Sequence, residues 1–148
     1  MNKITITGFD ELNRALAEDL PKATSKAVLR RTAIKVMERI RVGMAERAPK
    51  DSGELAGSMR TQPVKAKRIS RTRYAASSGV SVNTGPTGRE EGGNAAWQEF
   101  GTVDEPAQPY ARPTADAEGM NVLNDAKGEL TAQIDAAKAR IARKAARR

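Results

Sequence analysis

The acids and serines of this chain are its first candidates for chemistry, because its 148 residues contain no histidine and no cysteine. That composition excludes a Cys nucleophile, a Cys/His zinc site and a His general base. A carboxylate pair or a magnesium site is still allowed by residue type. The acids that could form one are Glu38, Glu46, Asp51, Glu54, Glu90, Glu91, Glu99 and Asp104.

None of these acids stands in a motif typical of catalysis. Glu90 and Glu91 fall in a glycine-rich segment that we expect to be a loop, where preorganisation is poor. Ser52 and Ser58 have no His base. The run Gly85–Arg89 lacks the Gly-x-x-x-x-Gly-Lys-Ser/Thr spacing of a phosphate-binding P-loop. We therefore predict a protein that is not an enzyme, without catalytic residues, cofactor or metal.

The charge of the chain favours anionic partners, since the formal net charge is +8. A basic helical end is expected at about 138–148, with its cations spread over several helix faces. It is either a solvated helix end whose cations suit the helix dipole, or a sequence-independent DNA phosphate contact. The residues of that contact would be Arg140, Arg143, Lys144, Arg147 and Arg148, with Lys138 beside them. Only 3% of the residues are aromatic, which argues against a dedicated single-strand binder.

Two long helices are the main elements expected to position these groups. The residues Lys3–Thr7 alternate as in a short strand, and Asp10 is a plausible N-cap for a helix carrying Leu12, Leu16 and Leu20. Pro21 should end that helix. A second helix is predicted over Lys22–Arg47, with an apolar stripe and a stop at Ala48-Pro49. The stripe is Leu29, Ala33, Val36, Ile40 and Met44.

The second half of the chain predicts a small sheet and a last helix. Arg60–Asn83 reads as extended, with Val64 in one strand and Val80 and Val82 in another, and Ser77–Gly79 as a turn. Thr84–Asn94 reads as a mobile glycine-rich loop, and a helix should run from about Thr114 to the end. The fold class is therefore α+β. We expect one domain over 1–148, with two long helices packed on a small antiparallel sheet and a glycine-rich loop.

Two segments have unusual local composition. The first, Ala48–Met59, is expected to end a helix, turn at Gly53 and pack again through Leu55. Asp51 or Ser52 is expected to cap a single helical turn that carries Leu55 and Met59. On local chemistry alone it is an ordinary corner between helices. The second runs from Trp97 to Pro113. It holds scarce aromatic residues, which in the simplest interpretation pack against the long helix. Its residues of interest are Trp97, Glu99, Phe100, Gly101, Thr102, Pro109, Tyr110, Arg112 and Pro113.

Taken together, these segments resemble a known family. The pattern is Ala-Pro-x-Asp-Ser-Gly-x-Leu-x-x-Ser-Met, then Glu-Phe-Gly-Thr, then Ala-x-Pro-Tyr-x-Arg-Pro before a C-terminal helix. This ordered set resembles the tail-completion, or head–tail joining, proteins of long-tailed bacteriophages, often described as minor tail components. The opening Gly8-Phe9-Asp10-Glu11-Leu12 fits as well. The resemblance covers roughly Ile4 to Ile141.

The resemblance implies a small α+β structural protein of the virion that forms a ring in the neck. Such a subunit finishes the tail and presents a surface to the head connector. Its partners would be copies of itself, the tail terminator or tube, the head connector, and genome DNA by non-specific contact in the channel. The two segments, around Asp51–Leu55 and Trp97–Pro113, would then organise the two faces of the ring contact, or the core beneath them.

Two alternatives stay open. One is a small basic DNA-binding protein, although no helix-turn-helix pattern supports it. The other is a neighbouring neck role, either tail terminator or head-completion protein. No run of residues reads as a signal peptide or a membrane span, so we expect no membrane contact and synthesis in a cytoplasm. The resemblance implies that this is the cytoplasm of the host bacterium.

Overall fold

The computed structural model describes residues 9–64 and 80–147. In chain order, the elements are α1 (Phe9–Arg14), the π-helix η1 (Ala15–Asp19), α2 (Lys22–Arg47), α3 (Glu54–Ser58), β1 (Met59–Pro63), β2 (Val82–Pro86), α5 (Arg89–Phe100) and α6 (Ala111–Ala145). The strand expected at Lys3–Thr7 and the turn expected at Ser77–Gly79 lie outside the described residues.

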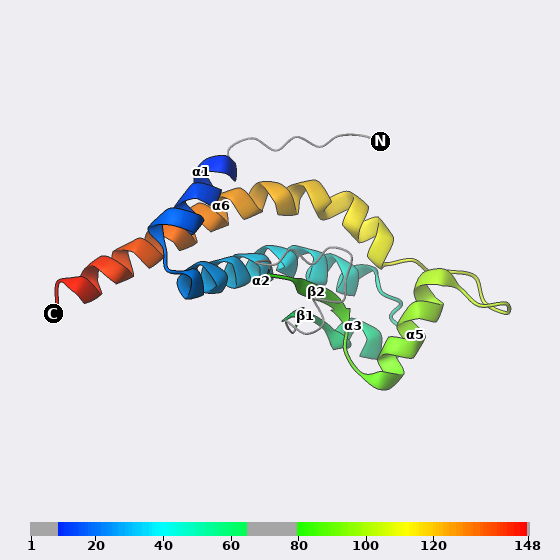
Figure 1. Ribbon diagram of the computed structural model, residues 1–148. Coiled ribbons are helices and arrows are strands. Elements are labelled where there is room, and N and C mark those ends of the chain that lie inside the picture. Colours follow the sequence, from blue (N-terminus) through cyan, green and yellow to red (C-terminus); the bar gives the residue numbers. More distant parts are fainter. Residues whose placement is uncertain (1–8, 65–79, 148) are drawn as a thin grey trace.

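The predicted fold class is confirmed: an α+β fold with two long helices and a two-stranded antiparallel sheet. Figure 1 shows α2 in the middle of the molecule, with α6 arching along one side and the sheet on the other. Helix α2 contacts α6 and both strands, so α6 reaches the sheet mainly through α2. The short α5 stands at one end of the molecule, and the C-terminal part of α6 extends past the other end (Figure 1).

Helix α2 has the bounds that the sequence predicts. Pro21 precedes its first turn in an extended conformation, and Ala48 leaves it in a similar conformation. The second half of the predicted stripe is buried: Val36, Ile40 and Met44. In the first half the buried positions are Val28 and Thr32, while Leu29 and Ala33 are only half-buried. The stripe therefore runs one residue earlier there, because α1, η1 and α6 cover that side of the helix.

The chain before α2 forms α1 and then the wide turn of η1. Helix α1 begins at Phe9, so Asp10 lies in its first turn and is not the N-cap. The buried hydroxyl of Ser25 meets backbone carbonyls at the corner between η1 and α2. It donates to the carbonyl oxygen of Leu16 at 2.7 Å and lies 3.4 Å from that of Leu20. This hydroxyl fixes the corner between η1 and α2.

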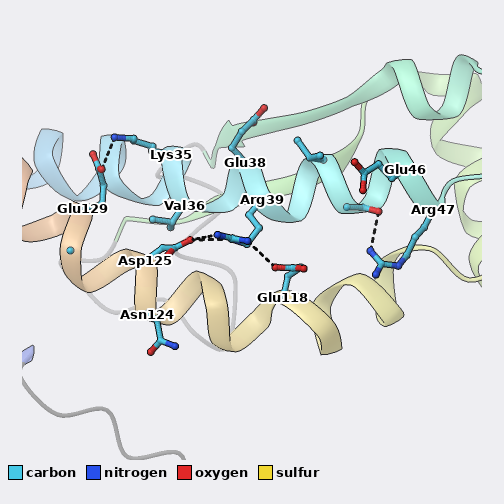
Figure 2. A pocket seen from close by; sticks show the side chains of 13 residues that line it. Lys35, Val36, Glu38, Arg39, Glu46, Arg47, Glu118, Asn124, Asp125 and Glu129 are labelled. Atoms are coloured by element: carbon cyan, nitrogen blue, oxygen red, sulfur yellow. Dashed lines mark hydrogen bonds and ion pairs between the residues drawn. The ribbon is translucent and has the colours of Figure 1, made fainter.

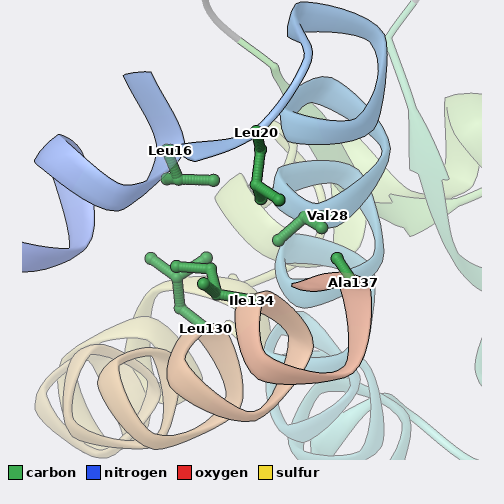
Figure 3. Packing of buried hydrophobic residues seen from close by; sticks show 6 residues of the cluster. All are labelled: Leu16, Leu20, Val28, Leu130, Ile134 and Ala137. Carbon is green, nitrogen blue, oxygen red and sulfur yellow. The ribbon is translucent and has the colours of Figure 1, made fainter. Parts of the chain in front are cut away.

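The core is divided into two clusters along α2 and α6. The first cluster joins η1, the start of α2 and the later part of α6 (Figure 3), and consists of Leu16, Leu20, Val28, Leu130, Ile134 and Ala137. The second lies at the other end, and consists of Ile40, Met44, Ala48, Met59, Ala95 and Tyr110. No buried residue is shared, so the two ends of the α2–α6 pair are packed separately.

The segment predicted as a glycine-rich loop is instead mostly regular structure, and that prediction is wrong. Strand β2 continues to Pro86 and pairs with β1, with Met59 opposite Pro86 and Pro63 opposite Val82. Helix α5 begins at Arg89, so only two residues join strand to helix. Ala95 and Glu99, four residues apart, are both buried on one side of α5. That packing outweighs the low helix propensity of the glycines near its start.

Helix α6 begins at Ala111, three residues before the predicted start. Its apolar side is buried at Leu130, Ile134 and Ala137, whereas Ile141 is 40% exposed. In the described part of the chain, no helix is long and apolar enough to cross a membrane.

Candidate functional site

The two segments that carry the family resemblance meet at one end of the molecule. Helices α3 and α5 contact each other there. Leu55 from the first segment packs against the same cluster that contains Tyr110 from the second. Met59, which closes the first segment, is fully buried in that cluster. Sequence positions some fifty residues apart thus share one core.

Glu99 organises this end of the molecule. Its carboxylate accepts hydrogen bonds from the backbone N–H groups of Tyr110 and Ala111, both at 2.8 Å, and of Arg112 at 3.1 Å. These are donors of the first turn of α6, which has no side-chain cap from Tyr110. A carboxylate in this position satisfies the free N–H groups and suits the positive end of the helix dipole. Glu99 is therefore the cap of a 35-residue helix.

The ionised form of the Glu99 carboxyl group is strongly stabilised. Burial by itself would raise the pKa of the carboxyl, but the hydrogen bonds from Ala111, Arg112 and Tyr110 outweigh it and lower the pKa to about 2. The pKa of the neighbouring Tyr110 is raised, first by burial and then by the negative charge of Glu99. The phenol stays neutral and its hydroxyl lies 3.4 Å from the carbonyl oxygen of Ala95.

Arg112 and Gly101 complete the junction between α5 and α6. The Arg112 Nε donates to Glu99 Oε1 at 2.8 Å, and its Nη2 donates to the Glu99 carbonyl oxygen at 2.7 Å. The guanidinium also lies 4.9 Å from the centroid of the Phe100 ring. Gly101 has φ +77°, and a Cβ there would lie 2.8 Å from the Ala107 nitrogen. Only glycine fits this turn without strain.

The remaining predicted residues of this segment shape the loop between α5 and α6. The Thr102 hydroxyl accepts from the backbone N–H groups of Asp104 and Glu105, at 3.3 and 3.0 Å. Pro109 is exposed just before the helix. Pro113 lies in the first turn of α6, where a missing N–H costs little.

Three apolar side chains at this end face solvent. Trp97 is 59% exposed, Phe100 is 69% exposed and Val103 is fully exposed. The expectation that residues of this segment pack against the long helix is confirmed for Tyr110, which shares a buried cluster with Ile40 and Met44 of α2. It is wrong for Trp97 and Phe100, because α5 turns Glu99 and Ala95 inward instead. Trp97 and Phe100 are three residues apart, on one side of α5. Two of the five aromatic residues of the chain are thus placed on the surface.

The predicted corner at Asp51–Leu55 is present, with the turn carried by Gly53 at φ +77°. Asp51, Ser52 and Gly53 are exposed, and Leu55 is half-buried. The Ser52 hydroxyl accepts from the Glu54 N–H at 3.3 Å, and Gly53 is the N-cap residue of α3. The three exposed residues form a surface turn above the shared core.

A groove of about 840 Å³ lies between the middle parts of α2 and α6 (Figure 2). Ion pairs bridge it: Lys35 Nζ lies 2.6 Å from Glu129 Oε2, and Arg39 lies 2.9 Å from Asp125 and 3.3 Å from Glu118. The hydrogen bond from Lys35 lowers the pKa of Glu129. The carboxylates in its lining are Glu38, Glu46, Glu118, Asp125 and Glu129. With Lys35, Arg39 and Arg47 as the cations, five against three, the lining has a formal charge of −2.

The basic end of α6 is exposed throughout 138–147. The helix extends to Ala145, and a spacing of three and four places Arg140, Arg143 and Lys144 on one face. Arg147 follows in the turn after the helix and is exposed as well, and we refer to these four cations together as the stripe. Lys138 lies on the opposite side, 2.6 Å from Asp19. Arg148 lies outside the described residues.

Sequence reasoning missed the groove and the exposed Val103. The ion pairs of the groove join residues that are separated by 79 to 94 positions in the sequence, and no local spacing predicts such pairs. Among the described residues, no group of three or more acidic side chains is arranged to hold a metal ion. The chain matches no protein-family model, no curated protein and no solved structure.

Proposed function

We propose that this chain is a structural, non-enzymatic subunit of the neck of a tailed bacteriophage, which forms a ring, finishes the tail and joins it to the head connector. The observation that carries the proposal is the meeting of the two resembling segments over one core, with Glu99 tying α5 to α6. Both motifs thereby contribute to a single end of the subunit.

That end has the character of a protein contact surface. Aromatic residues are enriched in protein interfaces and dominate their binding energy. Trp97 and Phe100 are exposed on α5. Glu99 of the same helix is held by five hydrogen bonds to residues 110–112 at the start of α6. The surface is therefore preorganised, which lowers the entropic cost of docking. Its partner in this proposal is another neck or tail protein of the virion.

Deletion of the gene from the phage or prophage, followed by electron microscopy of the induced lysate, tests the proposal. Filled heads beside unattached tails are the expected result. Tails with abnormal ends or lengths would assign the neighbouring role of tail terminator. Intact infectious particles would refute a structural role in the virion.

Complementation of that deletion tests the surface itself. Trp97→Ser/Phe100→Ser should leave folding intact and fail to restore joined particles. Met120→Ser, at another half-exposed apolar position on α6, should restore them. Equal rescue by both variants would show that the exposed aromatics do not dock a partner.

A basic DNA-binding protein is the second candidate, and the exposed stripe at the end of α6 favours it. Phosphate contacts make affinity fall linearly on a logarithmic salt scale. Fluorescence anisotropy with labelled duplex DNA should show such a slope for a soluble monomer. Absence of binding at low salt would reject this candidate.

A further inference from the structure

The groove and the basic end of α6 are complementary in charge, and they lie at different places on the subunit. The groove lining carries five carboxylates against three cations, and one of the five, Glu38, is paired with Arg41 outside the lining. Residues 138–147 contain five cations and no acid. Within the described chain, Glu46 of the groove and the stripe residues Arg140, Arg143 and Lys144 are in no salt bridge, so these charges are free to pair elsewhere.

The two features also agree in length. The groove is lined by α2 residues from Lys35 to Arg47, a rise of about 18 Å at 1.5 Å per residue. The end of α6 from 138 to 147 measures about 14 Å on the same scale, so it fits within the length of the groove. Each feature further offers one apolar side chain that is 40% exposed, Val42 in the groove and Ile141 beside the stripe.

The basic end cannot reach the groove of its own subunit. Helix α6 lines the groove with residues 118–129 and continues without a break to Ala145. Figure 1 shows that end extending away from the middle of the molecule. Folding back would require several turns of helix to unwind. A second copy offers the same groove with no such cost.

We propose that the stripe Arg140, Arg143, Lys144 and Arg147 of one copy docks in the α2–α6 groove of the next copy, with Ile141 against Val42. The contact joins two different faces, so it is head-to-tail and repeats from copy to copy. This inference rests on the proposed function in one respect, that a ring subunit needs two complementary faces, and it names them. The contact itself can be measured on the purified protein, without the virion.

A charge swap tests the proposal on the full-length protein. The tail variant is Arg140→Glu/Arg143→Glu/Lys144→Glu, and the groove variant is Glu38→Lys/Glu46→Lys. Each should raise the apparent dissociation constant for self-association by about tenfold or more in sedimentation velocity at low salt. Mixed together, they should assemble again, because every tail then meets a groove of opposite charge. The matched control, Lys26→Glu/Arg30→Glu/Arg31→Glu, makes the same charge change on exposed cations of α2 outside the groove and should assemble like wild type.

Cysteine trapping gives an independent measurement, because the chain has no cysteine of its own. Ile141→Cys mixed with Val42→Cys should form a disulfide-linked pair on oxidation, several times faster than Ile141→Cys with Met120→Cys. Equal rates would overturn the proposed docking. A wild-type protein that stays monomeric at high concentration and low salt would overturn it too, as would a mixture of tail and groove variants that fails to assemble.

The outcomes separate this inference from the proposed function. If the tail variant restores joined particles fully in the gene deletion, the docking is wrong while the neck role stands. If the deletion leaves particles intact, the neck role is wrong whatever the purified protein does. Loss of duplex DNA binding by the tail variant, with unchanged self-association, would overturn the docking and assign the stripe to DNA.

Discussion

Replacing Glu99 by Gln should destabilise the protein by about 3 kcal/mol at pH 7. A carboxyl pKa lowered from 4.5 to about 2 by folding corresponds to about 3 kcal/mol, since each pKa unit is worth about 1.4 kcal/mol. The side chain is only 7% exposed, so solvent screens its interactions little. Gln keeps one acceptor oxygen, but it places an NH₂ group against N–H donors and removes the charge at the start of α6.

The pH dependence has a definite sign. The folded-state pKa of Glu99 is depressed, so its contribution is fully present above the unfolded pKa of about 4.5 and is lost as pH falls towards 2. The difference in unfolding free energy between wild type and Glu99→Gln should therefore shrink from about 3 kcal/mol at pH 7 to about 1 kcal/mol at pH 3. Other carboxylates titrate equally in both proteins and cancel from this difference.

Urea denaturation followed by circular dichroism at 222 nm measures these free energies. Trp97, the only tryptophan, gives a second signal from α5 itself. Glu105→Gln is the matched control, because Glu105 is exposed in the same loop and only its backbone meets Thr102. It should change stability by less than about 0.5 kcal/mol. If the two variants are equally stable at pH 7, or if the Glu99→Gln effect is the same at pH 3, the charge of Glu99 does not stabilise the start of α6.

Three further substitutions follow from close contacts, each measured by urea unfolding. Gly43→Ala should destabilise by about 1 kcal/mol, because its Cβ would lie 2.8 Å from Thr114 Cγ2 and overpacking exceeds the gain in helix propensity. Adding Thr114→Ser, which removes that methyl, should recover most of the lost stability. The control Gly119→Ala, where a Cβ meets open space, should stabilise the protein. A stabilising effect of Gly43→Ala would contradict the close contact with Thr114. Gly101→Ala should cost about 2 kcal/mol through its positive φ and the Ala107 backbone, and an effect near zero would mean that the turn relaxes. Ser25→Ala should lower the free energy of unfolding by about 1–2 kcal/mol, because it leaves the Leu16 carbonyl without its donor. Unchanged stability would mean that water replaces the hydroxyl.

The sequence predicted best where local signals agree. Helix α2 has its predicted bounds because Pro21 and Ala48-Pro49 terminate it by backbone chemistry alone. The prediction from sequence failed at Thr84–Asn94, where composition favoured a loop but the tertiary burial of Ala95 and Glu99 imposed a helix. Propensity is a weak prior against such packing.

The chemistry of the candidate site was only partly predictable. Glu99 and Arg112 could be chosen from their motifs, but the cap itself uses backbone donors 11 to 13 residues away, and these have no residue-type signature. The groove depends on pairs such as Lys35 with Glu129, which a single sequence cannot match. The exposure of Trp97 was missed because an aromatic residue in a chain poor in rings is usually expected in the core.

The divided core has a consequence for how this protein could change over time. Residues of the first cluster, such as Ile134, share no buried neighbour with residues of the second, such as Tyr110. Substitutions at distant sites without common partners act additively. The end bearing Trp97 can therefore drift to suit a new partner without altering the packing that supports the basic end, and the reverse is also true. One chain of this size can keep one of its contacts constant while the other diverges.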